Sequence, residues 1–348
     1  MAEKYNQLKD LGEFKLIEYL TQNVKIHHSS TLKGIGDDAA VIDHENRKTV
    51  VSTDMLVEGV HFDMVFTPLK HLGYKAVAVN LSDIYAMNAQ PRQITVSLAI
   101  SSKYSVEAIA DIYEGMIHAA NFYGVDIIGG DTTSSLKGLI ISITALGEAK
   151  EEDIVYRNGA KEHDLLVVSG DLGGAYAGLN LLQREKEVWK VNPNMQPELE
   201  GYDYVLERQL KPEARKDVIQ FLSELGVKPS SMIDVSDGLA SEIHHICKQS
   251  NLGCSLYEEK IPIDPMTYKV VREFDMDPTV CALSGGEDYE LLFTISQSDF
   301  DKIKGNPHWT VIGHMTDASH GVNLITSGGS VTPLKAQGWN SFDDQDKD

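Results

Sequence analysis

Aspartates that follow short apolar runs are the residues of this 348-residue chain whose types and spacing most clearly suggest chemistry. The stretch Gly34–Asp63 contains five aspartates around two apolar runs, together with Ser52, Thr53 and His61. Three later stretches repeat this arrangement: Ile127–Ser135 (IIGGDTTSS), Met232–Glu242 (MIDVSDGLASE) and Ala282–Phe293 (ALSGGEDYELLF). Each places a carboxylate beside small residues where a buried strand should reach the surface. We therefore expect the four stretches to meet around cations and a phosphate.

Magnesium is the cation that such residues suit. Hard cations take oxygen ligands, and Mg²⁺ usually binds through one or two carboxylates plus substrate phosphates and water. Asp234 and Asp237 lie three residues apart, and both point past the same helix N-terminus if a helix begins near Ser236. Helix capping explains one of these carboxylates but does not readily explain both. The pattern fits phosphoryl transfer, in which metals neutralise phosphates and little covalent chemistry is needed.

Other catalytic motifs are missing from the sequence. No Lys directly follows a Gly, which excludes a Walker A loop. The protein-kinase motifs, a GxSxG elbow and an HExxH pair are also absent. The GDLGG turn at Gly170–Gly174 could bind a phosphate at a helix N-terminus, although a tight turn is the simpler interpretation. A calcium-binding or structural metal protein fits less well, because the chain has no EF-hand loop.

Composition limits the partners. A formal charge of −21 argues against nucleic acid and anionic membranes. The three cysteines form no metal-binding spacing, so we expect reduced thiols. No apolar run approaches transmembrane length, and the polar start MAEKYNQLKD lacks the apolar region of a signal peptide. We therefore expect a cytoplasmic protein.

The length and the alternation of elements predict two α/β domains. The charged segment Glu148–Asp164 is the expected junction. The predicted domains are residues 1–150 and 151–342, followed by a disordered tail at 343–348. Helices are expected at 69–87, 106–123 and 213–225, a strand at Ile94–Ile100, and an excursion or mobile loop at Gln183–Tyr204.

Asp83 is the unusual residue of the first of these helices, because it falls on the apolar stripe with Leu72, Ala76 and Val79. An ionised carboxylate on a buried face is costly unless it is paired or bound to a metal. Two interpretations stay open: Asp83 is a metal ligand, or it caps a helix that breaks at Ser82–Asp83.

Taken together, seven stretches closely resemble the thiamine-monophosphate kinase family, within the superfamily of aminoimidazole ribonucleotide synthetase and selenophosphate synthetase. They are GIGDDAAVI, VSTDMLVEGVHF, GYKAVAVNLSDIYAMNAQP, IIGGDTT, RNGAKEHDLLVVSG, IDVSDGL and LSGGEDYELLF. The resemblance extends from about Phe14 to Phe342, in the order of the family. VNLSDIYAMNAQP and LSGGEDYEL point to the thiamine branch in particular.

The resemblance implies ATP-dependent phosphorylation of thiamine monophosphate to thiamine diphosphate. The γ-phosphoryl group would pass directly and in line, with several Mg²⁺ ions and no phosphoenzyme. The implied fold has two α/β domains. The N-terminal domain would bind ATP and Mg²⁺, and its mixed sheet would form a barrel across a homodimer. The C-terminal domain would complete the nucleotide and substrate site.

Site residues follow from the resemblance, motif by motif. The implied Mg²⁺ ligands are Asp38, Ser52, Thr53, Asp54, Asp83, Asp131, Asp234 and Asp237. The implied nucleotide contacts are Tyr113, Gly130, Asp131, Arg157 and Ser236, and the implied thiamine contacts are His61, Glu287 and Trp339. Simpler interpretations remain for two of them: His61 as a packed core histidine, and Trp339 as a residue that seals a domain edge.

Two other functions remain open. One is another ATP-dependent enzyme of the superfamily, such as a cyclising ligase. The other is a non-enzymatic nucleotide or metal binder of the same fold. Selenophosphate synthetase and the hydrogenase-maturation relative fit less well, because no Cys precedes Cys247 and the C-terminus carries none.

Overall fold

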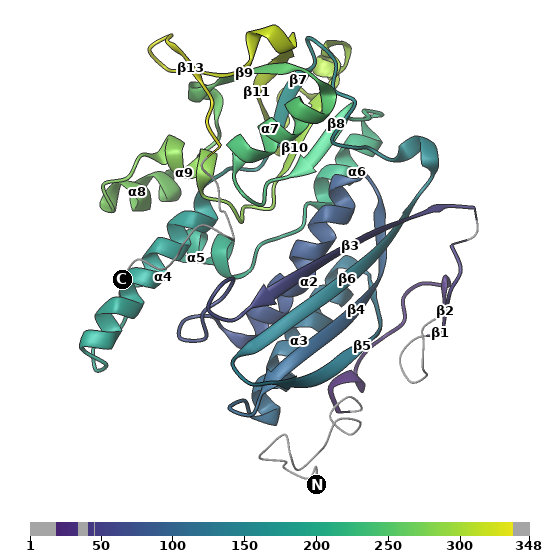
Figure 1. The fold of residues 1–348 in the computed structure, drawn as a ribbon, viewed down its shortest axis with the longest axis vertical. Helices are drawn as coiled ribbons and strands as arrows, with labels where there is room; N and C mark the ends of the chain where they lie inside the picture. Colours follow the sequence, from purple (N-terminus) through teal and green to yellow (C-terminus); the bar gives the residue numbers. More distant parts are fainter. Residues whose placement is uncertain (1–18, 34–40, 45, 337–348) are drawn as a thin grey trace. The chain divides into compact units, whose positions relative to one another are not determined.

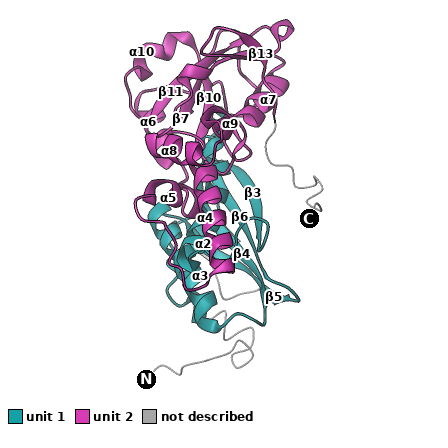
Figure 2. Ribbon diagram, turned by 90° about the vertical axis from the view of Figure 1, so that its left-hand side faces the viewer, with its two compact units in different colours: residues 1–154 teal, residues 155–348 magenta. Residues whose placement is uncertain are grey.

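The computed structural model describes residues 19–33, 41–44 and 46–336. The chain divides into two compact units, residues 1–154 and 155–348 (Figure 2). Each unit combines a β-sheet with helices, which confirms the predicted α/β fold class. The predicted barrel across a homodimer stays a prediction, as do the roles of the two domains. The predicted disordered tail lies outside the described residues.

Unit 1 is built on a four-stranded sheet with helices α2 and α3 on one face (Figure 1). Its strand order is β3-β6-β4-β5, and only β4 and β5 are parallel. A short pair, β1–β2, precedes this sheet. The elements are β1 (Thr31–Lys33), β2 (Val41–Ile42), β3 (Lys48–Val57), α2 (Leu69–Ala86), β4 (Gln90–Ser101), α3 (Val106–Tyr123), β5 (Asp126–Ser135), β6 (Leu139–Ala149) and the 3₁₀ turn η1 (Glu151–Asp153).

Helices α2 and α3 of unit 1 pack unusually closely because glycines lie at their crossing. A Cβ added to Gly73 of α2 would lie 1.8 Å from the carbonyl oxygen of Ile112, and one added to Gly115 of α3 would lie 2.0 Å from that of Lys70. Almost the whole of α2 is buried, including Leu81. This helix is therefore a rigid support for the polar residues that it carries.

Unit 2 is built on a seven-stranded mixed sheet in the order β13-β12-β9-β11-β7-β10-β8. Its strands are β7 (Leu165–Ser169), β8 (Ser231–Asp234), β9 (Gly253–Tyr257), β10 (Leu291–Ile295), β11 (Trp309–Thr316), β12 (Val322–Ile325) and β13 (Val331–Pro333). Its helices are α4 (Gly174–Val191), α5 (Asp203–Leu210), α6 (Lys216–Glu224), α7 (Leu239–Ser250), α8 (Pro265–Glu273), α9 (Pro278–Ser284) and α10 (Phe300–Ile303), with 3₁₀ turns η2 (Glu258–Lys260), η3 (Gln297–Asp299) and η4 (Ala318–His320).

Three local expectations differ from the structure. Helix α2 runs unbroken through Asp83 to Ala86, so the interpretation of Asp83 as the cap of a broken helix is wrong. The predicted loop at Gln183–Tyr204 is helical as far as Val191, because α4 continues through a polar surface sequence. Helix α7 begins at Leu239 rather than near Ser236, since Gly238 before it has a φ of +114° that does not continue a helix.

The crossing of α2 and α3 generates a stability prediction. Gly73→Ala should lower the unfolding free energy by about 3 kcal/mol or more, because the new methyl group would collide with rigid backbone. Calorimetric thermal unfolding measures the effect. Gly129→Ala is the matched control, since a Cβ there meets no atom within 4 Å. Equal melting temperatures for the two variants would contradict the close crossing.

Candidate functional site

A polar cluster in unit 1 lies between β3 and α2. Side chains of alternate strand residues point to the same face, so Ser52 and Asp54 both face the helix. The Ser52 hydroxyl donates a hydrogen bond to Oδ2 of Asp83, and the Asp54 amide donates to Oδ1 of Asn80 at 2.9 Å. Asn80 and Asp83 are three residues apart and share one face of α2. Three of the implied metal ligands therefore lie together.

The electrostatics of this cluster suit a divalent cation. Burial and the nearby charge of Asp83 both raise the pKa of Asp54, to about 6. Two neighbouring carboxylates and a hydroxyl are oxygen donors of the kind that Mg²⁺ prefers, and bound positive charge would favour the ionised form of both acids. The residues present therefore fit a magnesium ion.

The described residues do not by themselves complete a metal site. Among the residues that the structure describes, no group of three or more His, Cys, Asp or Glu side chains could by itself hold a metal ion. Asp38 lies outside the described residues, and Asp234 and Asp237 belong to unit 2.

Thr53 and Asp131 lie apart from the cluster. The Thr53 side chain is on the opposite face of β3, where its hydroxyl is 3.0 Å from that of Thr144 on β6. Asp131 is on β5, three strands along the sheet from β3, which corresponds to roughly 15 Å at the usual strand spacing. Gly130 beside it has no room for a side chain, because a Cβ would lie 1.7 Å from the carbonyl oxygen of Val96.

The other implied residues of unit 1 occupy separate positions. His61 follows β3 in a tight turn, where its Nδ1 accepts a hydrogen bond from the amide of Val57 at 3.1 Å. The proton of the neutral ring is then on Nε2, which becomes a donor. Tyr113 is buried in α3, and burial raises its pKa to about 12. Trp339 lies outside the described residues.

In unit 2, two loops that carry implied site residues are hydrogen-bonded together. The amide of Glu287 donates to the carbonyl of Ser236 at 2.7 Å, and the amide of Tyr289 donates to that of Val235 at 2.9 Å. Gly286 makes this approach possible, because a Cβ there would lie 2.7 Å from the same Ser236 carbonyl. The structure therefore places an implied nucleotide contact beside an implied thiamine contact.

The turn from Asp234 to Gly238 has its own support. Asp234 ends β8 and is buried, and Asp237 follows in the turn before α7. The buried carboxylate of Glu242 accepts the amide of Asp237 at 3.0 Å. Burial raises the pKa of Asp237, and the positive charge of Arg157 acts in the opposite direction. An implied metal ligand and an implied nucleotide contact are thus electrostatically coupled.

The GDLGG turn is better explained as structure than as a phosphate site. Its Gly173 has a φ of +81°, and the amides of Gly173 and Ala175 at the start of α4 donate to the buried carboxylate of Asp288 at 2.7 and 3.3 Å. An acid from within the chain therefore occupies the position that an anion would take.

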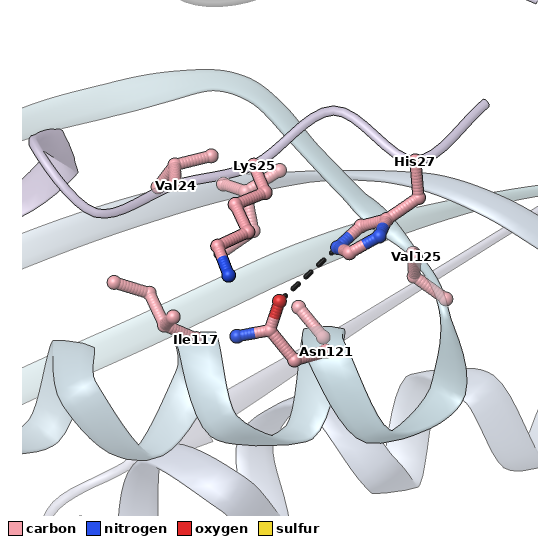
Figure 3. Close-up of a pocket in the computed structure, with 8 residues that line it drawn as sticks. Val24, Lys25, His27, Ile117, Asn121 and Val125 are labelled. Atoms are coloured by element: carbon pink, nitrogen blue, oxygen red, sulfur yellow. Dashed lines mark hydrogen bonds between the residues drawn. The ribbon is translucent and has the colours of Figure 1, made fainter. Parts of the chain in front are cut away.

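A small hollow in unit 1 is also no candidate. It lies between α3 and the chain around Lys25, and Val24, Ile117 and Val125 contribute to its lining (Figure 3). His27 Nε2 donates to Oδ1 of Asn121 across it at 3.1 Å. Its volume of about 10 Å³ accommodates no more than one water molecule.

Sequence reasoning missed two residues that support the site, Asn80 and Glu242. Asn80 also donates from Nδ2 to the carbonyl of Ala76 at 2.9 Å, which orients its amide oxygen toward Asp54. A detectable signal existed, because Asn80 is a polar residue inside the apolar run AVAVNL, one helical turn before Asp83.

Comparison with known proteins decides the family. The chain is 35% identical to thiamine-monophosphate kinase of Bacillus subtilis (strain 168) over 341 residues, which cover 95% of this chain and all of that protein. The chain belongs to the thiamine-monophosphate kinase family. Residues 36–149 also match the family model described as AIR synthase related protein, N-terminal domain.

Solved structures of the family have the same fold. Thiamine-monophosphate kinase from Stenotrophomonas maltophilia K279a superposes with a TM-score of 0.76 at 32% identity, covering 92% of this chain and 98% of that one. The structure of AaThiL complexed with AMPPCP and TMP gives a TM-score of 0.74 at 30% identity, covering 97% and 99%.

The acidic pair generates a prediction about metal binding. Mg²⁺ with an ATP analogue should raise the melting temperature of the wild type, because a ligand that binds only the folded state stabilises it by about 2.7 kcal/mol at 100 times its Kd. Asp83→Asn should lose most of this rise. Its melting temperature in EDTA should not fall, since the repulsion of Asp54 is removed.

Differential scanning fluorimetry measures both effects. Asp111→Asn on α3 is the control, since Asp111 is a partly exposed acid that lies 4.0 Å from Lys70. An Asp83→Asn variant that keeps the full magnesium response would remove Asp83 from the metal site.

Proposed function

We propose that this protein phosphorylates thiamine monophosphate at the expense of ATP and forms thiamine diphosphate. The supporting observation is the Asp54–Asp83 pair, two neighbouring carboxylates on a strand and a rigid helix, within motifs of a family whose members are named for this reaction. A relative at 30% identity was solved with AMPPCP and TMP, which also supports ATP and thiamine monophosphate as substrates.

The proposed metal ligands come from both units. Asp38, Ser52, Thr53, Asp54, Asp83 and Asp131 belong to the first, and Asp234 and Asp237 to the second. Magnesium ions bound there would neutralise the negative charge of the ATP phosphates. The chain itself would contribute nucleotide contacts from Tyr113, Gly130, Asp131, Arg157 and Ser236.

Direct in-line transfer suits this set of residues. The acceptor is a phosphate monoester, and its second pKa of about 6 leaves the oxygen largely deprotonated near neutral pH. The reaction then needs no general base, and positioning and electrostatics supply the catalysis. Both donor and acceptor are anionic, so the cluster of carboxylates can serve this reaction only through bound cations.

The thiamine half of the substrate would contact His61, Glu287 and Trp339. The neutral ring of His61 carries its proton on Nε2, because Nδ1 already accepts from the amide of Val57. Glu287 offers a carboxylate to the positively charged thiazolium ring, and an indole such as that of Trp339 can stack on a flat cation.

A homodimer is part of the proposal. Val51 and Met55 lie on the face of β3 that points away from α2, and they are 58% and 55% exposed. Exposed apolar residues along a sheet face favour association with another sheet. A second copy of the same chain, joined through these strands, would bury them.

A cytoplasmic location is also proposed. The three cysteines, Cys247, Cys254 and Cys281, are all buried free thiols, which suits a reducing compartment. Among the described residues, no helix is long and apolar enough to cross a membrane.

The test is formation of thiamine diphosphate from ATP, Mg²⁺ and thiamine monophosphate, followed by chromatography. Asp54→Asn and Asp234→Asn should each lower kcat roughly 100-fold, because each removes charge that holds a metal ion. Circular dichroism should show that both variants stay folded, and Asp153→Asn on the exposed η1 turn is a control that should retain activity.

The alternatives give different results in the same experiment. Tight ATP binding without thiamine diphosphate would favour a non-enzymatic binder. ATP hydrolysis that depends on a different acceptor would favour another enzyme of the superfamily. Near-normal turnover of Asp54→Asn at limiting Mg²⁺ would exclude Asp54 from the metal site.

A further inference from the structure

The turn after β3, residues 58–62, carries His61 and is held to the end of that strand by backbone hydrogen bonds. The carbonyl of Val57 accepts the amides of Val60 and His61 at 3.1 and 2.9 Å. The ring of His61 folds back onto the same strand end, because its Nδ1 accepts the amide of Val57 at 3.1 Å. The direction of this ring therefore depends on where the turn is held.

The side chain of Glu58, the first residue of the turn, binds the neighbouring strand β6. Glu58 and Leu139 follow Val57 and Ile140, the last residues that pair across β3 and β6. The amide of Glu58 donates to the carbonyl of Leu139 at 3.0 Å, and the amide of Leu139 donates in return to the carboxylate oxygen Oε2 of Glu58 at 2.8 Å. In a regular antiparallel ladder the return bond goes to a backbone carbonyl. The carboxylate therefore completes the pairing where the backbone leaves the strand.

Two further donors reach the same carboxylate from the segment that follows β4. Lys103 donates from Nζ to Oε1 of Glu58 at 2.6 Å, and the Tyr104 hydroxyl donates to Oε2 at 2.6 Å. The Glu58 side chain is only 17% exposed. Burial raises its pKa, but the hydrogen bonds from Lys103, Tyr104 and Leu139 outweigh burial and bring the pKa below its ordinary value. Glu58 is therefore ionised near neutral pH and joins the turn to two strands.

Three donors at one point require a side chain that only accepts. An ionised carboxylate has about four lone-pair sites and no donor, whereas the amide of a glutamine turns two N–H groups toward its surroundings. Gly138 leaves room for this carboxylate, because a Cβ there would lie 2.9 Å from Oε2 of Glu58. The surroundings of position 58 therefore select a glutamate.

We propose that Glu58 is a positioning residue that fixes the place of His61 in the thiamine site. This inference rests on the proposed function, in which His61 contacts the thiamine half of the substrate. The carboxylate of Glu58 fixes the start of the turn, and the backbone hydrogen bonds to Val57 carry that position to His61. The proposed nucleotide contacts lie on α3, on β5 and in unit 2, so loss of Glu58 should affect the thiamine substrate selectively.

Steady-state kinetics of the wild type, Glu58→Gln and Glu148→Gln test the proposal. Glu58→Gln should raise KM for thiamine monophosphate about tenfold, because a displaced contact binds its substrate less well, and should leave KM for ATP nearly unchanged. Glu148→Gln is the matched control. Glu148, near the other end of β6, is also a buried acid, and it accepts Nε of Arg92 on β4 at 2.9 Å. Its replacement should lower the melting temperature and change neither KM.

A double mutant tests whether Glu58 acts through His61. In a His61→Ala background, adding Glu58→Gln should leave KM for thiamine monophosphate nearly unchanged, because residues that act on one contact are not additive. A merely structural role for Glu58 predicts a lower melting temperature with the wild-type KM, or the same factor in both backgrounds.

Tyr104→Phe covers the case in which Glu58→Gln does not fold. It removes one donor to Glu58 and keeps the buried ring, so the variant should stay folded. The loss of one hydrogen bond should raise KM for thiamine monophosphate about threefold. If Glu58→Gln does not fold, an unchanged KM of Tyr104→Phe overturns the inference.

The outcomes separate this inference from the proposed function. A wild type that forms no thiamine diphosphate overturns the proposed function, and this inference with it. An active wild type whose folded Glu58→Gln variant keeps the wild-type KM for thiamine monophosphate overturns the inference alone. Equal increases in both KM values, a similar increase in Glu148→Gln, or full additivity with His61→Ala also overturn it.

Discussion

Buried carboxylates must be compensated, and the rest of the structure depends on how the two units meet that requirement. In unit 2, arginines and backbone amides compensate Asp288 and Glu290 within the fold. In unit 1, burial and the nearby charge of Asp83 raise the pKa of Asp54. The Ser52 hydroxyl donates to the Asp83 carboxylate, and Asn80 accepts the backbone amide of Asp54. An acidic pair of this kind gains most from a bound cation. Internal compensation stabilises the fold of unit 2, whereas the acidic pair of unit 1 is the proposed metal site.

Backbone rigidity holds both the compensated acids of unit 2 and the acidic pair of unit 1 in place. Helix α2 is buried along nearly its whole length and crosses α3 at glycines, so it can hold Asn80 and Asp83 against β3 without yielding. In unit 2, close approach at Gly286 lets two loops exchange backbone hydrogen bonds. In both units the polar residues lie where rigid backbone leaves them little freedom, which is the preorganisation that electrostatic catalysis requires.

The sequence by itself determined the α/β class, the helix that carries Asp83 and the family, because apolar periodicity and ordered motifs are local properties of the chain. It did not determine that Asn80 holds Asp54, or that Thr53 faces away from Ser52 and Asp54. The predicted start of α7 near Ser236 was also wrong. The turn before this helix is held by hydrogen bonds to a loop about fifty residues later in the chain. These features depend on contacts between distant segments, and only the packed tertiary structure decides which side chains meet.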